Sequence, residues 1–599
     1  MSGGAMARLS HTGRRRSATK VVGLIIGAGL IAAACGSKSE DVTTTTAAAP
    51  ETTAAAETTT TTIAPATTAA PPEVEPVYGG RLVVAGEAEV ANPWTPESMQ
   101  CDSYCQMRAR TFYDPLVVTN EDLEPVGFLL ESFTPNEDFT VWTLQVREGV
   151  TFHDGTPLDA ETVAFNLRTA GKGILLAGAL RDVAKGPDGE FLVTATGPMT
   201  VEVQMGLDGD PSQPRPWPTF PYFLSGQWGL MASKQWLEAV KAGTANSVDA
   251  VGTGPFIVDS YAPGDKLVVK RNENYWLTAE NGDQLPYLDE IEFRVIVDSQ
   301  TRGQALKAGD VDLIATSDPN VIKEFDGDEN FNLSDQNRFG ETSYLLIHLA
   351  KEGPLQDQSV RCALGQAIDK LDAIEVLSSG YVDPANGPFS PGQEGYLDDN
   401  GSLPYDPDAA AAAIEAYEAA NGPITINYST TPTATNLATA QYIQEVWGAV
   451  GVDVNIDQIE QSTLITNALT GAENFEVFLW RNHAGLGVDN QNFWWNSKSI
   501  LPGFALNFGR LADPVIDELL FEARGESDAD VRRGYAEDIN RRFAEQCWIL
   551  PLSFTKWGVI SSPKVQNLGR SPQTSGEGFL RDGQGFPGQV WMHAVFVDG

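Results

Sequence analysis

Basic residues and histidines are scarce in this chain of 599 residues. It has 40 lysines and arginines against 80 aspartates and glutamates, so its net charge is −40, and it has only five histidines. Nucleic-acid binding needs clustered cations that neutralise phosphates, and this composition argues against such a partner. The acidic excess is interpreted as a soluble surface that repels anionic lipid headgroups. The few histidines leave few candidates for acid–base catalysis.

Apolar runs long enough to span a membrane are absent beyond the N-terminal region, which resembles an export signal. Three arginines (14–16) and Lys20 precede an apolar stretch at 21–34. The sequence AAACGS then places Cys35 in a lipobox-like site, where a lipoprotein signal peptide is cut and the cysteine lipidated, although Ala32 stands where leucine is preferred. An ordinary signal peptide with an incidental cysteine is the alternative, and the choice between the Sec and Tat export routes stays open.

Residues 36–76 contain mostly Thr, Ala, Pro and Glu, with almost nothing to bury. Such a segment cannot form a core, so we expect a disordered tether. If 1–35 is a lipoprotein signal peptide, this tether holds a folded body away from a lipidated Cys35. The protein is then expected outside the cytoplasm, attached to the outer face of the cell membrane by its lipid.

Cysteine is scarce as well, with four residues after the N-terminal one. An even number in an extracytoplasmic protein indicates disulfides. Cys101 and Cys105 are four positions apart, which favours a local bridge, and Cys362 and Cys547 would then pair over a long distance. Free buried thiols are the alternative. No histidine lies at ligand spacing near either pair, so no metal site is predicted.

The remaining sequence alternates between strand and helix patterns. Period-two alternation of apolar residues predicts strands at 82–85, 141–146, 291–297 and 452–456. Helical spacing predicts helices that include 360–368, 443–450 and 515–520, the first of them capped by Asp357. This mixture is typical of an α/β protein with mixed sheets.

The stretch VTFHDGTPLDAETV places His153 beside Asp154, the residue types of a catalytic pair. A hydrolase also needs a nucleophile and an oxyanion site, and neither GxSxG nor HExxH occurs in the chain. Asp154 and Gly155 instead form a turn dipeptide, and Asp159 is placed to cap a helix that begins near Ala160. We therefore expect a structural role for the pair and no catalytic residue.

Several further motifs follow one another in a set order. They are YGGRL, FYDPLV, REGVTFHDGTPLDAETVAFNL, VGTGPFIVDSYAPGDKLVVKRNENYW, LPYLDEIEFRVIVDSQTRGQALKAGDVDL, GPLQDQSVRCALGQAIDK, YDPDAAAAAIEAY and DPVIDELLFEA, the last followed by RRGYAEDINRRFAEQCWILPLSF. By these motifs the chain resembles the extracellular solute-binding proteins of ABC importers, family 5, the oligopeptide, dipeptide and nickel-binding type. The resemblance runs from about Tyr78 to Phe554.

The resemblance implies an α/β, two-lobed periplasmic-binding-protein-like fold of type II, with an extra domain, mixed sheets and a hinged cleft. By similarity, lobe I comprises 77–118, 206–340 and 556–599. The extra domain comprises 119–205, and lobe II comprises 341–555. Closure of the lobes by a hinge motion would trap a ligand.

The resemblance also implies the function of an extracytoplasmic solute-binding component of an ABC importer. Such a protein captures a peptide or peptide-like solute and delivers it to membrane permease subunits with associated ATPases, without a cofactor and without chemistry on the solute. An oligosaccharide and a metal chelate are alternative ligands. An extracellular hydrolase and a sensory receptor subunit of the same fold are alternative functions.

The segment FEVFLWRNHAGLGVDNQNFWW departs from the pattern of the peptide-binding relatives. In those relatives a loop in this part of lobe II carries an aspartate that pairs with the α-ammonium group of the peptide. The place just after Trp480 reads Arg481, Asn482 and His483, and Asp489 comes later, where relatives carry another acidic residue. The amine anchor is therefore not visibly retained.

Other ligand contacts are expected from this segment and from lobe I. Arg481 is a candidate to bind a carboxylate or phosphate, and His483 is a candidate to donate to a ligand or approach a chelated metal. Trp480 and Trp494, with Asn482, complete the candidates in lobe II, where the tryptophans would stack on a ligand or pack the loop itself. Glu89 and Asn92, just after the first strand, are the candidates in lobe I; a solvated turn is their alternative role.

Overall fold

The computed structural model describes residues 74–599, apart from 88, 90–93, 174–175, 177, 336–339, 472–474, 483–486, 577, 584–586 and 599, and apart from the side chains of Asp335 and Asn482. Cys35, the expected signal peptide and the expected tether up to residue 73 lie outside the described residues, as do Asn92 and His483. The description below concerns the compact unit of residues 73–599.

A seven-stranded mixed sheet is built around the first strand of this unit. Its strands, in sheet order, are β12 (Asn332–Asp335), β20 (Gly558–Ser561), β11 (Leu313–Thr316), β1 (Arg81–Gly86), β10 (Glu290–Val295), β9 (Lys266–Arg271) and β8 (Phe256–Ala262). β1 pairs in parallel with β10 and β11 on its two sides. Leu82 and Val84 alternate toward one core together with Ile291 and Phe293, as the period-two pattern predicts.

A five-stranded mixed sheet is built from later parts of the chain. Its strands, in sheet order, are β15 (Asp453–Gln458), β14 (Thr425–Thr430), β16 (Val477–Asn482), β13 (Glu341–Ile347) and β19 (Ile549–Thr555). β13 pairs antiparallel with both β16 and β19, whereas β14 pairs in parallel with β15 and β16. The core of this part includes Leu345, Ile426 and Trp447.

The chain passes directly between these two sheets at two neighbouring places. β12 leads into β13, and β19 leads into β20 after only residues 556 and 557. Asp335 is paired with Gly558 in one sheet, and Glu341 is paired with Thr555 in the other, so the strand ends on either side of the two connections are neighbours. Hinges between lobes commonly consist of a few connecting residues that absorb a change in backbone dihedrals.

A four-stranded antiparallel sheet forms a third layer. Its strands, in sheet order, are β4 (Leu130–Pro135), β5 (Val141–Val146), β7 (Thr200–Gln204) and β6 (Val193–Ala195). Trp142, Leu144 and Val146 of β5 alternate into the core, as the sequence predicts. Helix α2 (Ala160–Ala170) packs against β6 and β7.

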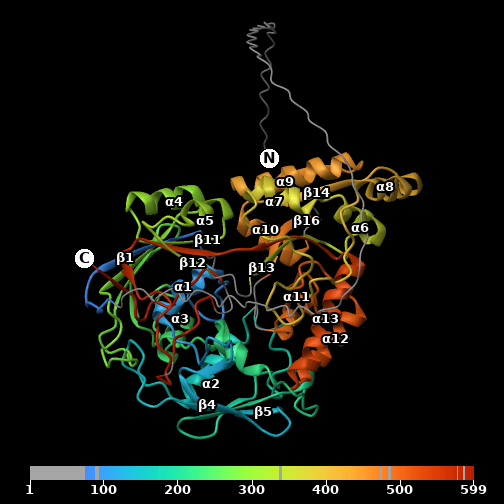
Figure 1. Ribbon diagram of the computed structural model, residues 1–599. Coiled ribbons are helices and arrows are strands. Elements are labelled where there is room, and N and C mark those ends of the chain that lie inside the picture. Colours follow the sequence, from blue (N-terminus) through green and yellow to red (C-terminus); the bar gives the residue numbers. More distant parts are fainter. Residues whose placement is uncertain are drawn as a thin grey trace, which may run out of the picture. The chain divides into compact units, whose positions relative to one another are not determined.

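Helices surround the sheets, and Figure 1 shows α4 beside β11 and α9 beside β14, in agreement with their contacts. Helix α5 contacts α4 and β20. The helices not yet given are α1 (Ser103–Phe112), α3 (Lys234–Lys241), α4 (Ser299–Ala308), α5 (Pro319–Phe325), α6 (Gln358–Gln366), α7 (Lys370–Ser378), α8 (Pro407–Asn421), α9 (Ala434–Ala449), α10 (Gln461–Thr470), α11 (Gln491–Trp495), α12 (Pro514–Gly525) and α13 (Ala529–Gln546). Short strand pairs join β2 (Val117–Thr119) to β3 (Pro125–Gly127), β17 (Ile500–Leu501) to β18 (Phe504–Ala505), and β21 (Val565–Gln566) to β22 (Phe596–Val597).

Local signals predicted two helix starts correctly and one strand end incorrectly. The Asp159 carboxylate accepts from the Thr162 amide at 2.8 Å, and the Asp357 carboxylate caps α6. The strand predicted to reach Val297 ends at Val295, however, and the Val297 side chain is 59% exposed. The physical reason is that Asp298 caps α4 directly after Val297, so the chain turns out of the sheet before it.

Both cysteine pairs are joined as disulfides. Cys101 bonds to Cys105 at the start of α1, with Cα atoms 4.9 Å apart, and Cys362 of α6 bonds to Cys547 at the end of α13, with Cα atoms 5.3 Å apart. Across the described ranges, no helix is long and apolar enough to cross a membrane. The same residues contain no cluster of three His, Cys, Asp or Glu side chains able to hold a metal.

Candidate functional site

Arg481 reaches from the five-stranded sheet to the seven-stranded one. It lies on β16, opposite Ser343 of β13. Its Nη1 donates to the Ser317 hydroxyl at 2.5 Å, and its Nη2 lies 3.4 Å from a carboxylate oxygen of Glu87. Glu87 follows β1 and Ser317 follows β11, so both come from the carboxyl ends of parallel strands. Ligands of open α/β sheets bind outside such strand ends.

The charge of Arg481 is balanced from both sheets. Glu341, almost fully buried where β13 begins, lies 3.8 Å from Nη1 of Arg481 and accepts from the Trp557 indole at 3.0 Å. The Trp557 ring centre is 5.2 Å from the Arg481 guanidinium, and Glu87 also contacts Arg302 at 3.7 Å. Burial opposes the charge of Arg481, but Glu341 and Glu87 together raise its pKa. With 35% of its side chain exposed, Arg481 remains accessible.

Glu89 has a buried cation as its partner. Its carboxylate accepts from Arg108 at 3.0 Å and from the Gly264 amide at 3.1 Å. Arg108 is almost fully buried, and its guanidinium lies over the Tyr104 and Trp94 rings at 4.7 and 5.2 Å. Glu89 thus neutralises a charge inside the seven-stranded layer, and its role in ligand binding stays a prediction.

The two candidate tryptophans belong to one aromatic cluster. Trp480 meets Trp494 at 5.9 Å between ring centres and Phe508 at 5.2 Å, and Trp494 also meets Phe508 and Phe493. Trp494 is only 7% exposed. The rings pack β16 against α11, which is one of the two roles expected from the sequence. Stacking of these tryptophans on a ligand stays a prediction.

Asp489 lies at the centre of a buried polar network that the sequence did not predict. It belongs to a short 3-10 helix (Val488–Asn490), and its side chain is 2% exposed. One carboxylate oxygen accepts from the Trp217 indole at 2.5 Å and the Thr219 hydroxyl at 2.8 Å, and the other from Arg524 at 2.6 Å. Because both oxygens have close partners, Asp489 is occupied within the protein.

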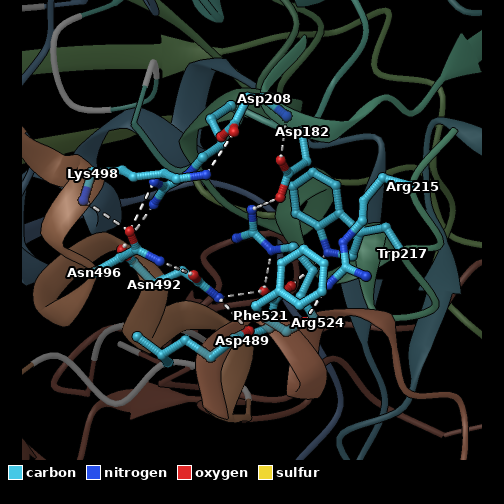
Figure 2. A network of polar contacts seen from close by, with 12 residues as sticks. Asp182, Asp208, Arg215, Trp217, Asp489, Asn492, Asn496, Lys498, Phe521 and Arg524 are labelled. Atoms are coloured by element: carbon cyan, nitrogen blue, oxygen red, sulfur yellow. Dashed lines mark hydrogen bonds and ion pairs between the residues drawn. The ribbon is translucent and has the colours of Figure 1, made fainter. Parts of the chain in front are cut away.

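Arg524 connects Asp489 to a distant part of the chain. From α12, its Nη1 meets the Asp182 carboxylate at 2.9 Å, and its guanidinium lies 4.2 Å from the Trp217 ring centre. Figure 2 shows this guanidinium between the two carboxylates. Burial opposes the charge of Arg524, but Asp489 and Asp182 raise its pKa. We call Asp182, Trp217, Thr219, Asp489 and Arg524 the bridging network.

Contacts around the bridging network join the same two regions, 181–219 and 489–525. Figure 2 shows Lys498 reaching Asp208, with Nζ 2.6 Å from the carboxylate. Arg181 donates to the Asn496 amide oxygen at 3.0 Å. Arg215 donates to the carbonyl of Phe521 and lies 3.7 Å from its ring centre. The partners are hundreds of residues apart and belong to no sequence motif, so only the folded chain reveals them.

His153 and Asp154 are occupied by structural contacts. The His153 ring contacts the Gly254 carbonyl oxygen at 3.0 Å through Nε2 and accepts from the Gly252 amide at 3.3 Å through Nδ1. Asp154 accepts from the Ser233 hydroxyl at 2.5 Å. Burial lowers the pKa of His153. These contacts are the turn and loop contacts expected of a structural pair.

The chain belongs to the bacterial extracellular solute-binding proteins, family 5, whose model matches residues 124–500. It is thus an extracytoplasmic solute-binding component of an ABC importer, and its family consists of binding proteins. Two relatives illustrate the family. The nickel-binding periplasmic protein of Escherichia coli K12 is 27% identical over 78% of this chain and 88% of its own length. The glutathione-binding protein GsiB of Escherichia coli O1:K1 is 26% identical over 60% of this chain and 66% of its own length.

Solved structures share the fold. The periplasmic binding protein DppA from Helicobacter pylori, in complex with the peptide STSA, superposes with a TM-score of 0.73 at 21% identity, covering 87% of this chain and 99% of its own. The α/β, two-lobed fold expected from the sequence is therefore confirmed.

Proposed function

We propose that this protein captures a peptide or peptide-like solute through a carboxylate of that solute, and delivers it unchanged to permease subunits with associated ATPases. The observation that carries the proposal is the position of Arg481. A cation on the five-stranded sheet lies at the strand ends of the seven-stranded sheet, with part of its side chain exposed.

A solute carboxylate would take the place of Glu87 on Arg481. The Glu87 contact is long, at 3.4 Å, and a partly exposed pair of this kind contributes little to stability. A bound carboxylate can accept two parallel hydrogen bonds from one guanidinium, which is a stronger arrangement. Glu341 stays close enough to hold the guanidinium in place. Exchange of one carboxylate for another therefore costs little and gains specific hydrogen bonds.

Recognition of a free amine is less well supported by the acidic residues of this region. Asp489 is buried and occupied by Trp217, Thr219 and Arg524. Glu89 neutralises Arg108. Recognition of a carboxylate, which every peptide and also glutathione carries, is better supported. One relative is named a glutathione-binding protein, and one solved structure of the same fold is a complex with a peptide.

The remaining contacts that we propose come from both lobes. They are Glu89, Asn92, Trp480, Asn482, His483 and Trp494. We propose lobe I as 77–118, 206–340 and 556–599. The extra domain and lobe II are proposed as 119–205 and 341–555. The pairs Asp335–Gly558 and Glu341–Thr555, at neighbouring ends of strands in the two large sheets, support a hinge at the junctions near residues 340 and 556.

A metal chelate is the second candidate ligand. A relative that covers 78% of this chain is named nickel-binding, and His483 follows Arg481 closely in the sequence. An arginine can hold the carboxylates of a chelator while a histidine approaches the metal. Elemental analysis of the purified protein distinguishes this case, because a peptide-like solute brings no stoichiometric metal.

Native mass spectrometry of the purified protein tests the proposal by detecting a co-purified solute. Arg481→Ala is expected to abolish the adduct and leave thermal unfolding of the empty protein nearly unchanged. Arg533→Ala is the matched control, because Arg533 is a half-exposed arginine paired with Asp530 on α13. An adduct that persists in Arg481→Ala would contradict the assignment, and turnover of a peptide or glycoside panel would contradict delivery without chemistry.

We also propose that residues 1–35 are a lipoprotein signal peptide, that Cys35 is lipidated, and that 36–76 is a tether. The lipobox-like AAACGS and the Thr/Ala/Pro-rich composition support this proposal. Cys35→Ser is expected to abolish metabolic labelling with a fatty-acid analogue and to release the protein from the membrane fraction. Unchanged labelling of Cys35→Ser would contradict the lipid assignment.

A further inference from the structure

The apolar cores of the compact unit fall into two separate groups. In the part of the chain that the structure describes, three core clusters contain only residues from 82–333 and 559–597, and two contain only residues from 344–552. We call 77–340 with 556–599 the first half and 341–555 the second half. They are the proposed lobe I with the extra domain, and the proposed lobe II. Because they share no apolar core, the halves are expected to move against each other, as domains with a polar interface do.

The bridging network joins these two halves through buried polar contacts. Asp182, Trp217 and Thr219 belong to the first half, and Asp489 and Arg524 belong to the second. Trp217 and Thr219 donate to Asp489 at 2.5 and 2.8 Å, and Arg524 donates to Asp182 at 2.9 Å. These contacts exist only while the halves lie together, so their free energy favours that arrangement over an open one.

Each half balances the charges of the network by itself. In the second half, Arg524 lies 2.6 Å from the Asp489 carboxylate. In the first half, Asp182 accepts from the Asp208 amide at 2.9 Å. Burial opposes the charge of Asp182, but Arg524 and Arg181 lower its pKa, and Arg181 belongs to the same half. Separation of the halves therefore hydrates these groups without leaving a buried charge unpaired, which is the costly outcome.

We propose that the bridging network is a latch, which favours the closed arrangement of the two halves whether or not a solute is bound. The network contains none of the residues proposed to contact the solute, so its contribution is the same with and without one. A larger closed fraction of the empty protein raises the apparent affinity for a solute that binds the closed form. The latch concerns the closing motion and thus goes beyond the proposed function, on which it rests only for the division into lobes.

Two lysine–carboxylate pairs of equal length allow the latch to be measured in the purified full chain. Lys498 of the second half lies 2.6 Å from Asp208 of the first, whereas Lys172 lies 2.6 Å from Glu190 within the first half. All four side chains are 42% to 54% exposed, so a water-soluble carbodiimide can join each pair through an amide bond. Mass spectrometry of the digested protein, dialysed to remove solute, then gives the yield of Lys498–Asp208 relative to Lys172–Glu190.

The relative yield is expected to depend on the bridging network. An asparagine in place of Asp182 has one acceptor oxygen for two donors, Arg524 and the Asp208 amide. A valine in place of Thr219 keeps the shape of the side chain but removes a donor to Asp489. The double variant Asp182→Asn/Thr219→Val is expected to lower the relative yield about fivefold or more, because hydrogen bonds to charged groups are lost from the closed form alone.

Asp138→Asn is the control, since this aspartate is exposed in the turn between β4 and β5, and it should leave the relative yield unchanged. An unchanged yield in the double variant would overturn the latch. An unaltered protein that forms the Lys172–Glu190 cross-link without the Lys498–Asp208 one would overturn it as well. If the double variant folds poorly and loses both cross-links, Thr219→Val alone decides, with a fall of about twofold expected. Failure of the solute site is seen separately, in the adduct of Arg481→Ala.

Discussion

Replacing Arg524 with methionine tests whether the bridging network holds two distant regions of the chain together. Methionine keeps much of the length and apolar volume of the side chain but removes the charge. Asp182 and Asp489 then remain as buried carboxylates without their common cation. Their side chains are 8% and 2% exposed, so water cannot replace the lost partner.

The magnitude follows from this burial. Removing one partner of a buried ion pair costs about 3–5 kcal/mol, since an uncompensated charge is left behind. The contacts at 2.6 and 2.9 Å place Arg524 in this class. A loss of this size is a large part of the about 5–15 kcal/mol that stabilises a typical native protein. We therefore expect Arg524→Met to lower the free energy of unfolding at pH 7 by about 3–5 kcal/mol.

Urea unfolding followed by tryptophan fluorescence measures this change, with the slope determined separately for each variant. Arg533→Met is the control, because its half-exposed pair with Asp530 contributes less than about 0.5 kcal/mol. The double variant Arg524→Met/Asp182→Asn removes one of the two stranded charges. It should recover about 1–3 kcal/mol relative to the single variant.

Two results would refute this reasoning. The first is a loss below about 1 kcal/mol for Arg524→Met, which is the size of an exposed pair. The second is a double variant that is less stable than Arg524→Met, because the two substitutions would then act independently. Either result would mean that the carboxylates of the bridging network are solvated or neutral in solution.

Two further predictions concern the disulfides and acid stability. The Cys362–Cys547 bridge closes a loop of 185 residues, and the Cys101–Cys105 bridge closes one of 4. Loop-closure entropy predicts that replacing both cysteines of the long loop with serine lowers the free energy of unfolding by about 5 kcal/mol, and that the same change in the short loop lowers it by at most about 2 kcal/mol. Equal losses in urea unfolding would contradict this prediction. Burial, assisted by Arg510, lowers the pKa of His348 to about 4. Between pH 6.5 and 4, His348 is protonated in the unfolded chain but stays neutral in the folded protein. The free energy of unfolding therefore falls by about 3 kcal/mol as the pH drops across this window. His348→Asn should flatten that part of the pH profile of unfolding.

Sequence reasoning succeeded where a structural feature depends on neighbouring residues. Asp159 and Asp357 cap their helices as expected, because a capping side chain bonds to amides only two or three positions ahead. The β5 alternation was visible for the same reason. Sequence reasoning failed at Val297, because the cap of the next helix ends the strand before this residue.

The candidate site was only partly visible in the sequence. Arg481 was singled out from its place after Trp480, but its partners Glu87 and Ser317 lie 394 and 164 residues away. The Asp182–Arg524 contact spans 342 positions. No periodicity or motif relates such pairs, since they meet only when separate strands and helices are packed.

By itself the sequence determined the family, the α/β class, the acidic surface and the local caps and strands, because each depends on composition or on residues close together in the chain. Only the tertiary structure decided that Asp489 is bonded to Arg524 and that Arg481 meets Glu87 and Ser317. Burial and charge pairing arise from elements brought together by folding. They determine which polar groups are already satisfied within the protein.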